Sequence, residues 1–266
     1  MKRIAVANMK GGVGKTVTSV NLSIGLANRG HRVLLVDMDP QGNVAHSLRI
    51  RATQNTIYDL MANDLAIDEV VRKEVRANLD VIPSNNVAFG LENRLAAETL
   101  REKILSRRMK SVQNYDFVVI DTSPAMNLLT VNTLLYVDIV MLVVSMDQMA
   151  IIGAVQSLTG LKRILSAFET AEKRVFVLPT MYNAATNGSR ETMTALREDP
   201  DLAKYLLPVI VRQDVKLGYA AASKQSIWEY DGRSRAAEDY TRLVGFILGE
   251  DGNEAEEARS YSSSEA

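Results

Sequence analysis

A glycine-rich run near the N-terminus, KGGVGKT, contains the residues with the clearest chemical potential. Glycines let backbone N–H groups curve around phosphate oxygens, and a helix that starts here adds a partial positive charge. Lys15 can reach the β and γ phosphates of a nucleotide, and the Thr16 hydroxyl can ligate Mg²⁺. Such a run between a strand and a helix predicts a nucleoside triphosphate site. The residues expected at the phosphates are Lys10, Gly11, Gly12, Val13, Gly14, Lys15, Thr16 and Val17.

Three aspartates follow apolar segments and can complete such a site. Asp37 and Asp39 stand in VDMDPQGN, and Asp121 ends YDFVVID. A carboxylate at the end of a strand beside a phosphate loop can contact Mg²⁺ or a water molecule near the γ phosphate. The buried strand that ends at Asp121 predicts that this carboxylate holds Mg²⁺, through water. For Asp37 and Asp39, an Asp-Pro turn with a helix cap is the alternative interpretation.

Short β-branched runs alternate along the chain with longer helical patterns. Continuous apolar strands separated by helices predict parallel strands that are buried on both faces by right-handed crossovers. The expected fold class is therefore α/β, a doubly wound and mostly parallel sheet with helices on both faces. The predicted strands are residues 3–8, 32–37, 117–121, 138–145 and 174–180, and the predicted helices are residues 16–28, 91–110 and 150–168.

Composition narrows the classes of protein that fit. The 266 residues are 47% apolar and 24% charged, and one globular domain over residues 1–249 is expected. Residues 250–266 hold six acids and one base with little apolar surface, which predicts a disordered tail. The remaining 30 bases and 26 acids give residues 1–249 a net charge of +4. The apolar run 4–7 is too short for a signal peptide, so a soluble cytoplasmic protein is expected.

The run KGGVGKT is similar to the deviant Walker A motif of the ParA/MinD family, because a second lysine, Lys10, opens the loop. The resemblance implies that two protomers sandwich two ATP molecules and that Lys10 contacts the phosphates bound by the partner. VDMDPQGN resembles the switch I motif of that family, which implies that Asp39 orients the attacking water and that Asp37 holds the magnesium shell and the loop. Lys10, Lys15 and Asp39 are thus the expected catalytic residues, and Thr16, Asp37 and Asp121 the expected metal site.

The C-terminal half carries weaker similarity to the same family. RVFVLPTMYN resembles the strand and turn that cover the adenine, which implies base contacts from Met181 and Asn183. Further on, Arg212 stands near an adenine-packing proline of the family, and Tyr219 replaces its glutamate. After Asp121, the sequence Thr-Ser-Pro replaces the usual x-Pro-Pro of switch II.

Basic residues gather in this half and predict a surface for nonspecific DNA. A groove of bases can bind phosphate backbones without reading sequence, and the resemblance gives Lys216 the place of such a contact. A domain with 31 bases also shows scattered basic residues by chance, so this interpretation competes with a plain solvated surface. A second basic group, between residues 101 and 110, is expected on the solvated face of its helix. The candidate DNA contacts are Arg190, Arg212, Lys216 and Lys224.

Several functions share this nucleotide chemistry. A reductase of the nitrogenase iron-protein type needs cysteines for its cluster, and the chain has none. A MinD-like membrane cycle needs a basic amphipathic C-terminal helix, whereas this chain ends in acids and serines, so no membrane partner is expected. The favoured hypothesis is a nucleoid-associated partition or positioning ATPase that forms a homodimer on ATP, binds nonspecific DNA and responds to a ParB-like or other cargo adaptor. A MinD-like membrane-cycling positioning ATPase and a nucleotide-gated dimeric scaffold with negligible turnover remain the alternatives, and the cargo stays open.

Overall fold

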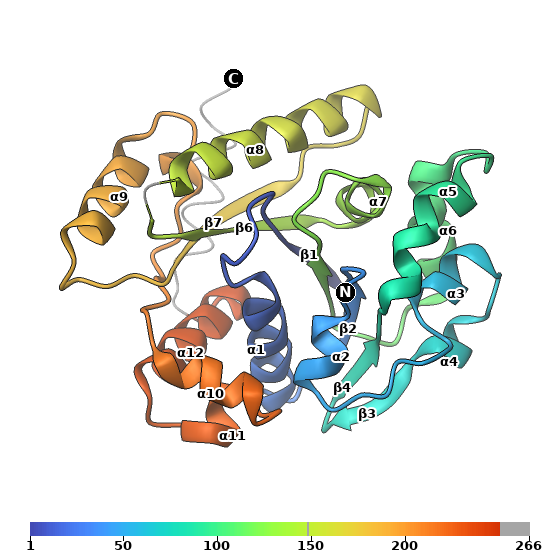
Figure 1. The fold of residues 1–266 in the computed structure, drawn as a ribbon, viewed down its shortest axis with the longest axis horizontal. Helices are drawn as coiled ribbons and strands as arrows, with labels where there is room; N and C mark the ends of the chain where they lie inside the picture. The colour runs from blue at the N-terminus through green and yellow to red at the C-terminus, as the bar shows by residue number, and fades with distance from the viewer. Residues whose placement is uncertain (148, 251–266) are drawn as a thin grey trace.

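A seven-stranded sheet forms the centre of the molecule in the computed structural model, which describes residues 1–147 and 149–250 (Figure 1). Six strands are parallel, and β3 runs antiparallel to β4 at one edge in the order β3-β4-β2-β5-β1-β6-β7. The predicted acidic tail lies outside the described residues except for Glu250. The strands are β1 (Lys2–Ala7), β2 (Val33–Met38), β3 (Arg72–Arg76), β4 (Leu79–Ile82), β5 (Phe117–Thr122), β6 (Ile139–Ser145) and β7 (Arg174–Thr180).

Helices cover both faces of the sheet, because alternate residues of the buried strands point to opposite sides. In β1, Ile4 and Val6 belong to one apolar core and Ala5 and Ala7 to the other. The first core is closed by α1 (Lys15–Asn28), α2 (Asn43–Ser47), α10 (Val215–Ala222), α11 (Ile227–Asp231) and α12 (Arg235–Leu248). The second is closed by α3 (Ile57–Ala62), α4 (Ile67–Val70), α5 (Leu91–Leu95), α6 (Ile104–Arg108), α7 (Leu128–Tyr136), α8 (Ala150–Ala167) and α9 (Asn187–Glu198).

This architecture confirms the predicted doubly wound α/β sheet, and four short 3₁₀ turns complete the described elements. No helix in the described part of the chain has the length and apolar character needed to cross a membrane. The turns are η1 (Asn86–Gly90), η2 (Arg101–Lys103), η3 (Met109–Ser111) and η4 (Ala203–Tyr205).

The predicted helix over residues 91–110 is wrong, because the segment breaks into α5, η2, α6 and η3. Leu100 adopts a left-handed conformation with φ of 53°, which a continuous helix does not allow. Asn132 of α7 stabilises the break: its amide donates to the carbonyl of Arg101, and its Oδ1 accepts from the Leu105 N–H. The basic residues of this segment therefore do not share one helix face, and Arg108 forms an ion pair with Asp64.

Helix α1, which begins at the phosphate loop, lies very close to α12 at Gly25. A Cβ atom on this glycine would lie 2.5 Å from Val244 Cγ2 and 2.8 Å from Trp228 Cη2. Valine is stiff at χ1, and the Trp228 indole is held by a 3.1 Å hydrogen bond to Thr241 Oγ1, so neither side chain yields freely. The contact thus fixes the helix that carries the phosphate loop against the C-terminal helix.

We expect Gly25→Ala to destabilise the fold by about 1–3 kcal/mol, the usual effect of overpacking, despite the better helix propensity of alanine. Urea unfolding gives the free energy of unfolding of each variant. Gly188→Ala is the matched control, because no atom lies within 4 Å of a Cβ at this position of α9. Equal unfolding midpoints for the two variants would show that α1 and α12 adjust without strain.

Candidate functional site

The carboxyl ends of β1, β2 and β5 meet at one edge of the sheet, and the loop between β1 and α1 lies over this edge. Gly12 and Gly14 have φ angles of 74° and 94°, in the left-handed region that favours glycine. Space is open around Gly11 and Gly12, where a Cβ atom would meet nothing within 4 Å. The loop carbonyl of Val13 accepts a 2.9 Å hydrogen bond from Thr180 Oγ1 of β7. The loop is therefore a fixed, open cradle at the N-terminus of a fourteen-residue helix.

Lys15 lies inside this cradle with only 7% of its surface exposed. Its Nζ donates a 2.9 Å hydrogen bond to the carbonyl of Lys10 at the start of the loop. Burial lowers the pKa of the Lys15 ammonium, while the carboxylates of Asp121 and Asp39 raise it. A cation that is poorly hydrated and held by a neutral carbonyl is well suited to bind an anion such as phosphate.

Asp37 and Asp121 are register partners on the adjacent strands β2 and β5, and both are fully buried. Thr16 Oγ1 donates to Asp121 Oδ2 at 2.6 Å, and Ser19 Oγ donates to Asp121 Oδ1 at 2.9 Å. Burial raises the pKa of Asp121 to about 6, although these two hydroxyls oppose the rise. Burial and the neighbouring Asp121 also raise the pKa of Asp37.

Oxygen donors of this kind fit Mg²⁺, which is typically held by one or two carboxylates together with nucleotide phosphates and water. Two buried carboxyl groups side by side are electrostatically unfavourable when both are charged, and a cation relieves this repulsion. No cluster of three or more His, Cys, Asp or Glu residues with a metal-site arrangement occurs among the described residues. Residues 1–147 and 149–250 therefore do not form a metal site from protein ligands alone.

The loop after β2 is shaped by its own carboxylates. Asp37 accepts hydrogen bonds from the N–H groups of Asp39 at 3.0 Å and Val44 at 3.2 Å, so both of its oxygens hold backbone. Asp39 accepts one from the Gln41 N–H at 3.0 Å through its Oδ1. Asp39 Oδ2 makes no such bond within the described residues and stays available at the site.

Lys10 lies over α8 of its own chain rather than over the cradle. Its ammonium forms an ion pair with Asp147, which follows β6, and its N–H donates to Asn8 Oδ1 at 2.8 Å. A Cβ atom on Gly153 of α8 would lie 3.5 Å from Lys10 Cβ, so the lysine stem packs closely on this helix. The ammonium of Lys10 is therefore held on its own protomer by Asp147.

The two residues predicted to contact the base lie just beyond β7. Met181 has a left-handed φ of 56°, and its Cε is 3.9 Å from the position of a Cβ on Gly14. The methionine therefore connects the phosphate loop to the segment that contains Asn183. Asn183 Nδ2 donates to Gln213 Oε1 at 3.1 Å, and its Oδ1 accepts from the Ala185 N–H at 3.0 Å.

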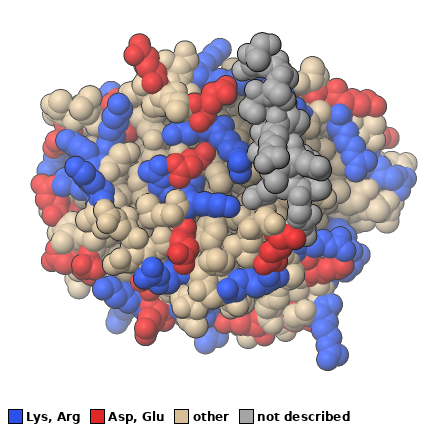
Figure 2. Space-filling view, turned by 180° about the vertical axis from the view of Figure 1, so that it is seen from behind, with Lys and Arg blue, Asp and Glu red and all other residues tan. Residues whose placement is uncertain are grey.

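The four predicted DNA contacts differ in their partners. Arg212 is held by Asp239 and Glu238, and Lys216 by Asp231 at 2.6 Å. Arg190 bonds to the carbonyl of Ala184 and the side chain of Asn187, and Lys224 contacts His46 beyond switch I. Among the described residues no carboxylate pairs with Arg190 or Lys224, so these two retain their net charge. Acidic and basic side chains alternate over the face seen in Figure 2, without a broad field of one sign.

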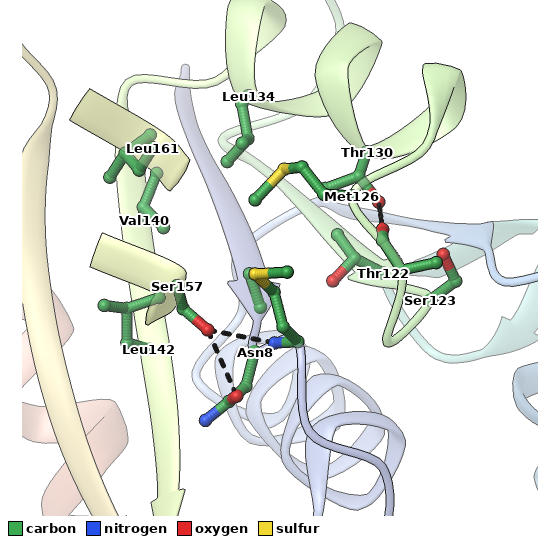
Figure 3. A pocket seen from close by; sticks show the side chains of 13 residues that line it. Asn8, Thr122, Ser123, Met126, Thr130, Leu134, Val140, Leu142, Ser157 and Leu161 are labelled. Atoms are coloured by element: carbon green, nitrogen blue, oxygen red, sulfur yellow. Dashed lines mark hydrogen bonds between the residues drawn. The ribbon is translucent and has the colours of Figure 1, made fainter. Parts of the chain in front are cut away.

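A small cavity lies on the opposite face of the sheet from α1, between α7, α8 and the ends of β1 and β5 (Figure 3). Ser157 Oγ accepts from the Met9 N–H at 3.0 Å and donates to Asn8 Oδ1 at 3.2 Å at the wall of this cavity. The volume of this cavity, about 20 Å³, is enough for roughly one water molecule and too small for a nucleotide. The open cradle above Lys15 is therefore the better candidate for a phosphate ligand.

Sequence reasoning missed two residues of this site. Ser19 lies one helical turn after Thr16, and that spacing on one face of α1 was the available signal. Asp147 follows the carboxyl end of β6, the strand beside β1, where the rule that identified Asp37 and Asp121 applies equally.

Comparisons with known proteins agree with this geometry. A family model described as an AAA domain matches residues 1–173. Sporulation initiation inhibitor protein Soj of Bacillus subtilis is 36% identical over 250 residues, which cover 91% of this chain and 96% of that protein. Chromosome-partitioning ATPase Soj of Treponema pallidum is 32% identical over 252 residues, 94% of this chain and 98% of that protein.

A solved structure shares the whole fold. Cobyrinic acid a,c-diamide synthase from Mycobacterium smegmatis, with bound ADP and magnesium, matches with a TM-score of 0.80. The two are 25% identical, and the match covers 95% of this chain and 96% of that one.

Proposed function

This chain belongs to the Soj/ParA family of partition ATPases, and on that premise we propose that it is a nucleotide-driven positioning switch that pairs around ATP and binds DNA without sequence preference. It is an ATPase, with ATP and Mg²⁺ as its ligands. The proposal rests on one observation above all. Lys15 and the carboxylates of Asp37, Asp39 and Asp121 converge at one edge of the sheet below an open glycine loop.

In this proposal the β and γ phosphates of ATP replace the Lys10 carbonyl as the partner of the Lys15 ammonium. The N–H groups of the loop and of the first turn of α1 surround the phosphate oxygens. Mg²⁺ would be held by Thr16 and Asp121 and, from a greater distance, by Asp37. When bound, it neutralises charge on the phosphates. Asp37 also keeps the switch I loop in shape through its two backbone hydrogen bonds.

Asp39 is proposed to orient the water that attacks the γ phosphate. Its backbone is fixed by Asp37, while one oxygen of its own carboxylate is uncommitted within the described residues. A carboxylate in this position acts on the water rather than on the nucleotide. Hydrolysis and binding are therefore expected to separate at this residue.

Lys10 is proposed to act across the dimer, and within its own protomer its ammonium pairs with Asp147. We expect Lys10→Ala to bind ATP with Mg²⁺ and to remain monomeric on multi-angle light scattering, because the partner's phosphates lose a cation. Lys162→Ala, at an exposed position of α8, is the control and should dimerise like the wild type. A Lys10→Ala protein that dimerises at wild-type concentration would leave Lys10 as a surface residue of α8.

DNA is the proposed ligand of the dimer. Dimerisation would bring the basic side chains of two protomers together on one surface. Arg190 and Lys224 are the best-supported contacts, because no carboxylate of the described chain neutralises them. Lys224 also touches α2 through His46, and α2 directly follows the switch I loop. This contact gives the nucleotide site a physical connection to the basic surface. A ParB-like or other adaptor is proposed to stimulate hydrolysis and release.

A further inference from the structure

The phosphate loop begins with two backbone N–H groups that are bound by side chains. Strand β1 ends at Ala7, so the sheet no longer pairs the backbone that follows. The Met9 N–H donates to Ser157 Oγ at 3.0 Å, and the Lys10 N–H donates to Asn8 Oδ1 at 2.8 Å. Ser157 and Asn8 are each 4% exposed. The start of the loop thus depends on two buried side chains for its hydrogen bonds.

Ser157 is the member of this group that comes from a distant part of the chain. It lies on α8, 148 residues after Met9, and Figure 3 shows it directed toward Asn8. Its single hydroxyl hydrogen faces two acceptors, the Gly153 carbonyl at 2.7 Å and Asn8 Oδ1 at 3.2 Å. A bond to the carbonyl four residues back is usual for a serine within a helix. The bond from the Met9 N–H is different, because it connects α8 to the phosphate loop.

This connection joins the loop to a fixed part of the fold. Helix α8 is anchored by Ala154, Leu158 and Leu161, which are at most 3% exposed and belong to the apolar core on that side of the sheet. Asn8 is fixed as well, since its Nδ2 donates to the Val143 carbonyl of β6 at 2.7 Å. The position of Met9 is therefore set by α8 and β6 together.

The start of the loop in turn affects the lysine that is expected to bind the phosphates. The carbonyl of Lys10, next to Met9, accepts the 2.9 Å hydrogen bond from Lys15 Nζ. The stem of Lys10 also packs on α8, where a Cβ atom on Gly153 would lie 3.5 Å from Lys10 Cβ. A shift of Met9 away from α8 would therefore move the Lys10 carbonyl and the loop that follows it.

We propose that Ser157 is a positioning residue for ATP hydrolysis: by accepting the Met9 N–H, it holds the start of the phosphate loop on α8 and so aligns the loop with the phosphates. This inference rests on the proposed ATP site. Ser157 acts through the backbone of the loop and is not itself a ligand of the nucleotide.

Two variants of equal size separate the hydroxyl oxygen from the volume of the side chain. Ser157→Thr keeps the oxygen, whereas Ser157→Val replaces it with a methyl group of similar shape. The small cavity that Ser157 lines, with a volume of about 20 Å³, offers space for an added methyl group. Ser157→Ala removes the oxygen without added volume.

Ser23→Ala is the matched control. Ser23 of α1 is 0% exposed, and its Oγ donates to the Ser19 carbonyl, four residues back, at 2.7 Å. Within the described part of the chain its hydroxyl forms no other hydrogen bond. Ser23→Ala therefore removes the same kind of buried hydroxyl without disturbing an N–H group of the loop.

The test measures ADP affinity by isothermal titration calorimetry in Mg²⁺, because ADP offers phosphates to the loop and is not hydrolysed. We expect Ser157→Val and Ser157→Ala to bind ADP about fivefold more weakly, the effect of losing one neutral hydrogen bond. Turnover at saturating ATP should also fall in both, by at least about fivefold, because a displaced loop misaligns the γ phosphate. Ser157→Thr and Ser23→Ala should match the wild type in both measurements.

Wild-type affinity and turnover in Ser157→Val and Ser157→Ala would overturn the inference. Equal losses in Ser157→Thr and Ser157→Val would do the same, because they would indicate packing, and so would equal losses in Ser157→Ala and Ser23→Ala. The Met9 amide of the wild type should exchange slowly with deuterated water. Rapid exchange there would overturn the inference even if Ser157→Val and Ser157→Ala failed to fold. If the wild type does not bind ADP, the proposed ATP site is wrong and the inference fails with it.

Discussion

Replacing Lys15 by alanine is expected to abolish ATP binding, with a loss of affinity of at least about 100-fold, because a charged hydrogen bond to the phosphates disappears from a desolvated site. Lys15 is 7% exposed, so water cannot substitute well for the missing ammonium. Lys15→Gln should show nearly the same loss, since it restores most of the volume and none of the charge. Calorimetric titration of ATP in Mg²⁺ measures both variants.

A surface lysine provides the control for this result. Lys162→Ala removes an equal charge from an exposed position of α8 and should leave ATP affinity unchanged. Urea unfolding of Lys15→Ala should remain cooperative, because its ammonium bonds only to a loop carbonyl within the described structure. Wild-type ATP affinity in a folded Lys15→Ala protein would show that the phosphates do not bind in the cradle.

Asp39→Ala is expected to bind ATP and to dimerise, while turnover falls by at least about 100-fold, as for loss of a group that positions the nucleophile. The dimer would then persist in ATP, and phosphate release and light scattering measure the two effects separately. Asp37→Ala should behave differently, because Asp37 holds the N–H groups of Asp39 and Val44 and so shapes the whole loop.

The exposed Asp68, which lies on α4 and pairs with Lys73, provides the control for Asp39. Asp68→Ala should hydrolyse ATP at the wild-type rate. Turnover at the wild-type rate in Asp39→Ala would assign water activation to another group, and failure of Asp39→Ala to bind ATP would make it a structural residue of switch I.

The central sheet and the location of the site could be predicted from the sequence, because both follow from local patterns. Apolar strands next to helical segments predict parallel pairing, and parallel strands end at the same edge of a sheet. Asp37 and Asp121 therefore had to lie near each other, and the structure pairs them directly in register. Strands β3 and β4 were not predicted, because RKEVR is almost entirely polar and LDVI is only four residues long.

Contacts between distant segments could not be predicted in this way. Lys10 pairs with Asp147, and Arg212 pairs with Asp239. The two residues of each pair are far apart in the chain, and no sequence periodicity connects them. Arg212 was predicted as a DNA contact from its charge, and the sequence did not show that Glu238 and Asp239 hold it. The break at Leu100 depends on Asn132 of α7, a residue outside the segment that it interrupts.

The measurement that tests the proposed function most directly is a fluorescence anisotropy titration of a nonspecific DNA duplex in ATP, in ADP and without nucleotide. The Asp39→Ala variant keeps the protein in its ATP-bound state, because its turnover is expected to be slow. The account predicts tight binding only in ATP, with little dependence on DNA sequence. Each phosphate neutralised contributes about −0.9 to the slope of log affinity against log salt, so a dimer with roughly four to eight contacts should show a steep slope. Equal affinity in all three nucleotide states, or no binding in any of them, would contradict the proposal that ATP-driven pairing creates the DNA surface.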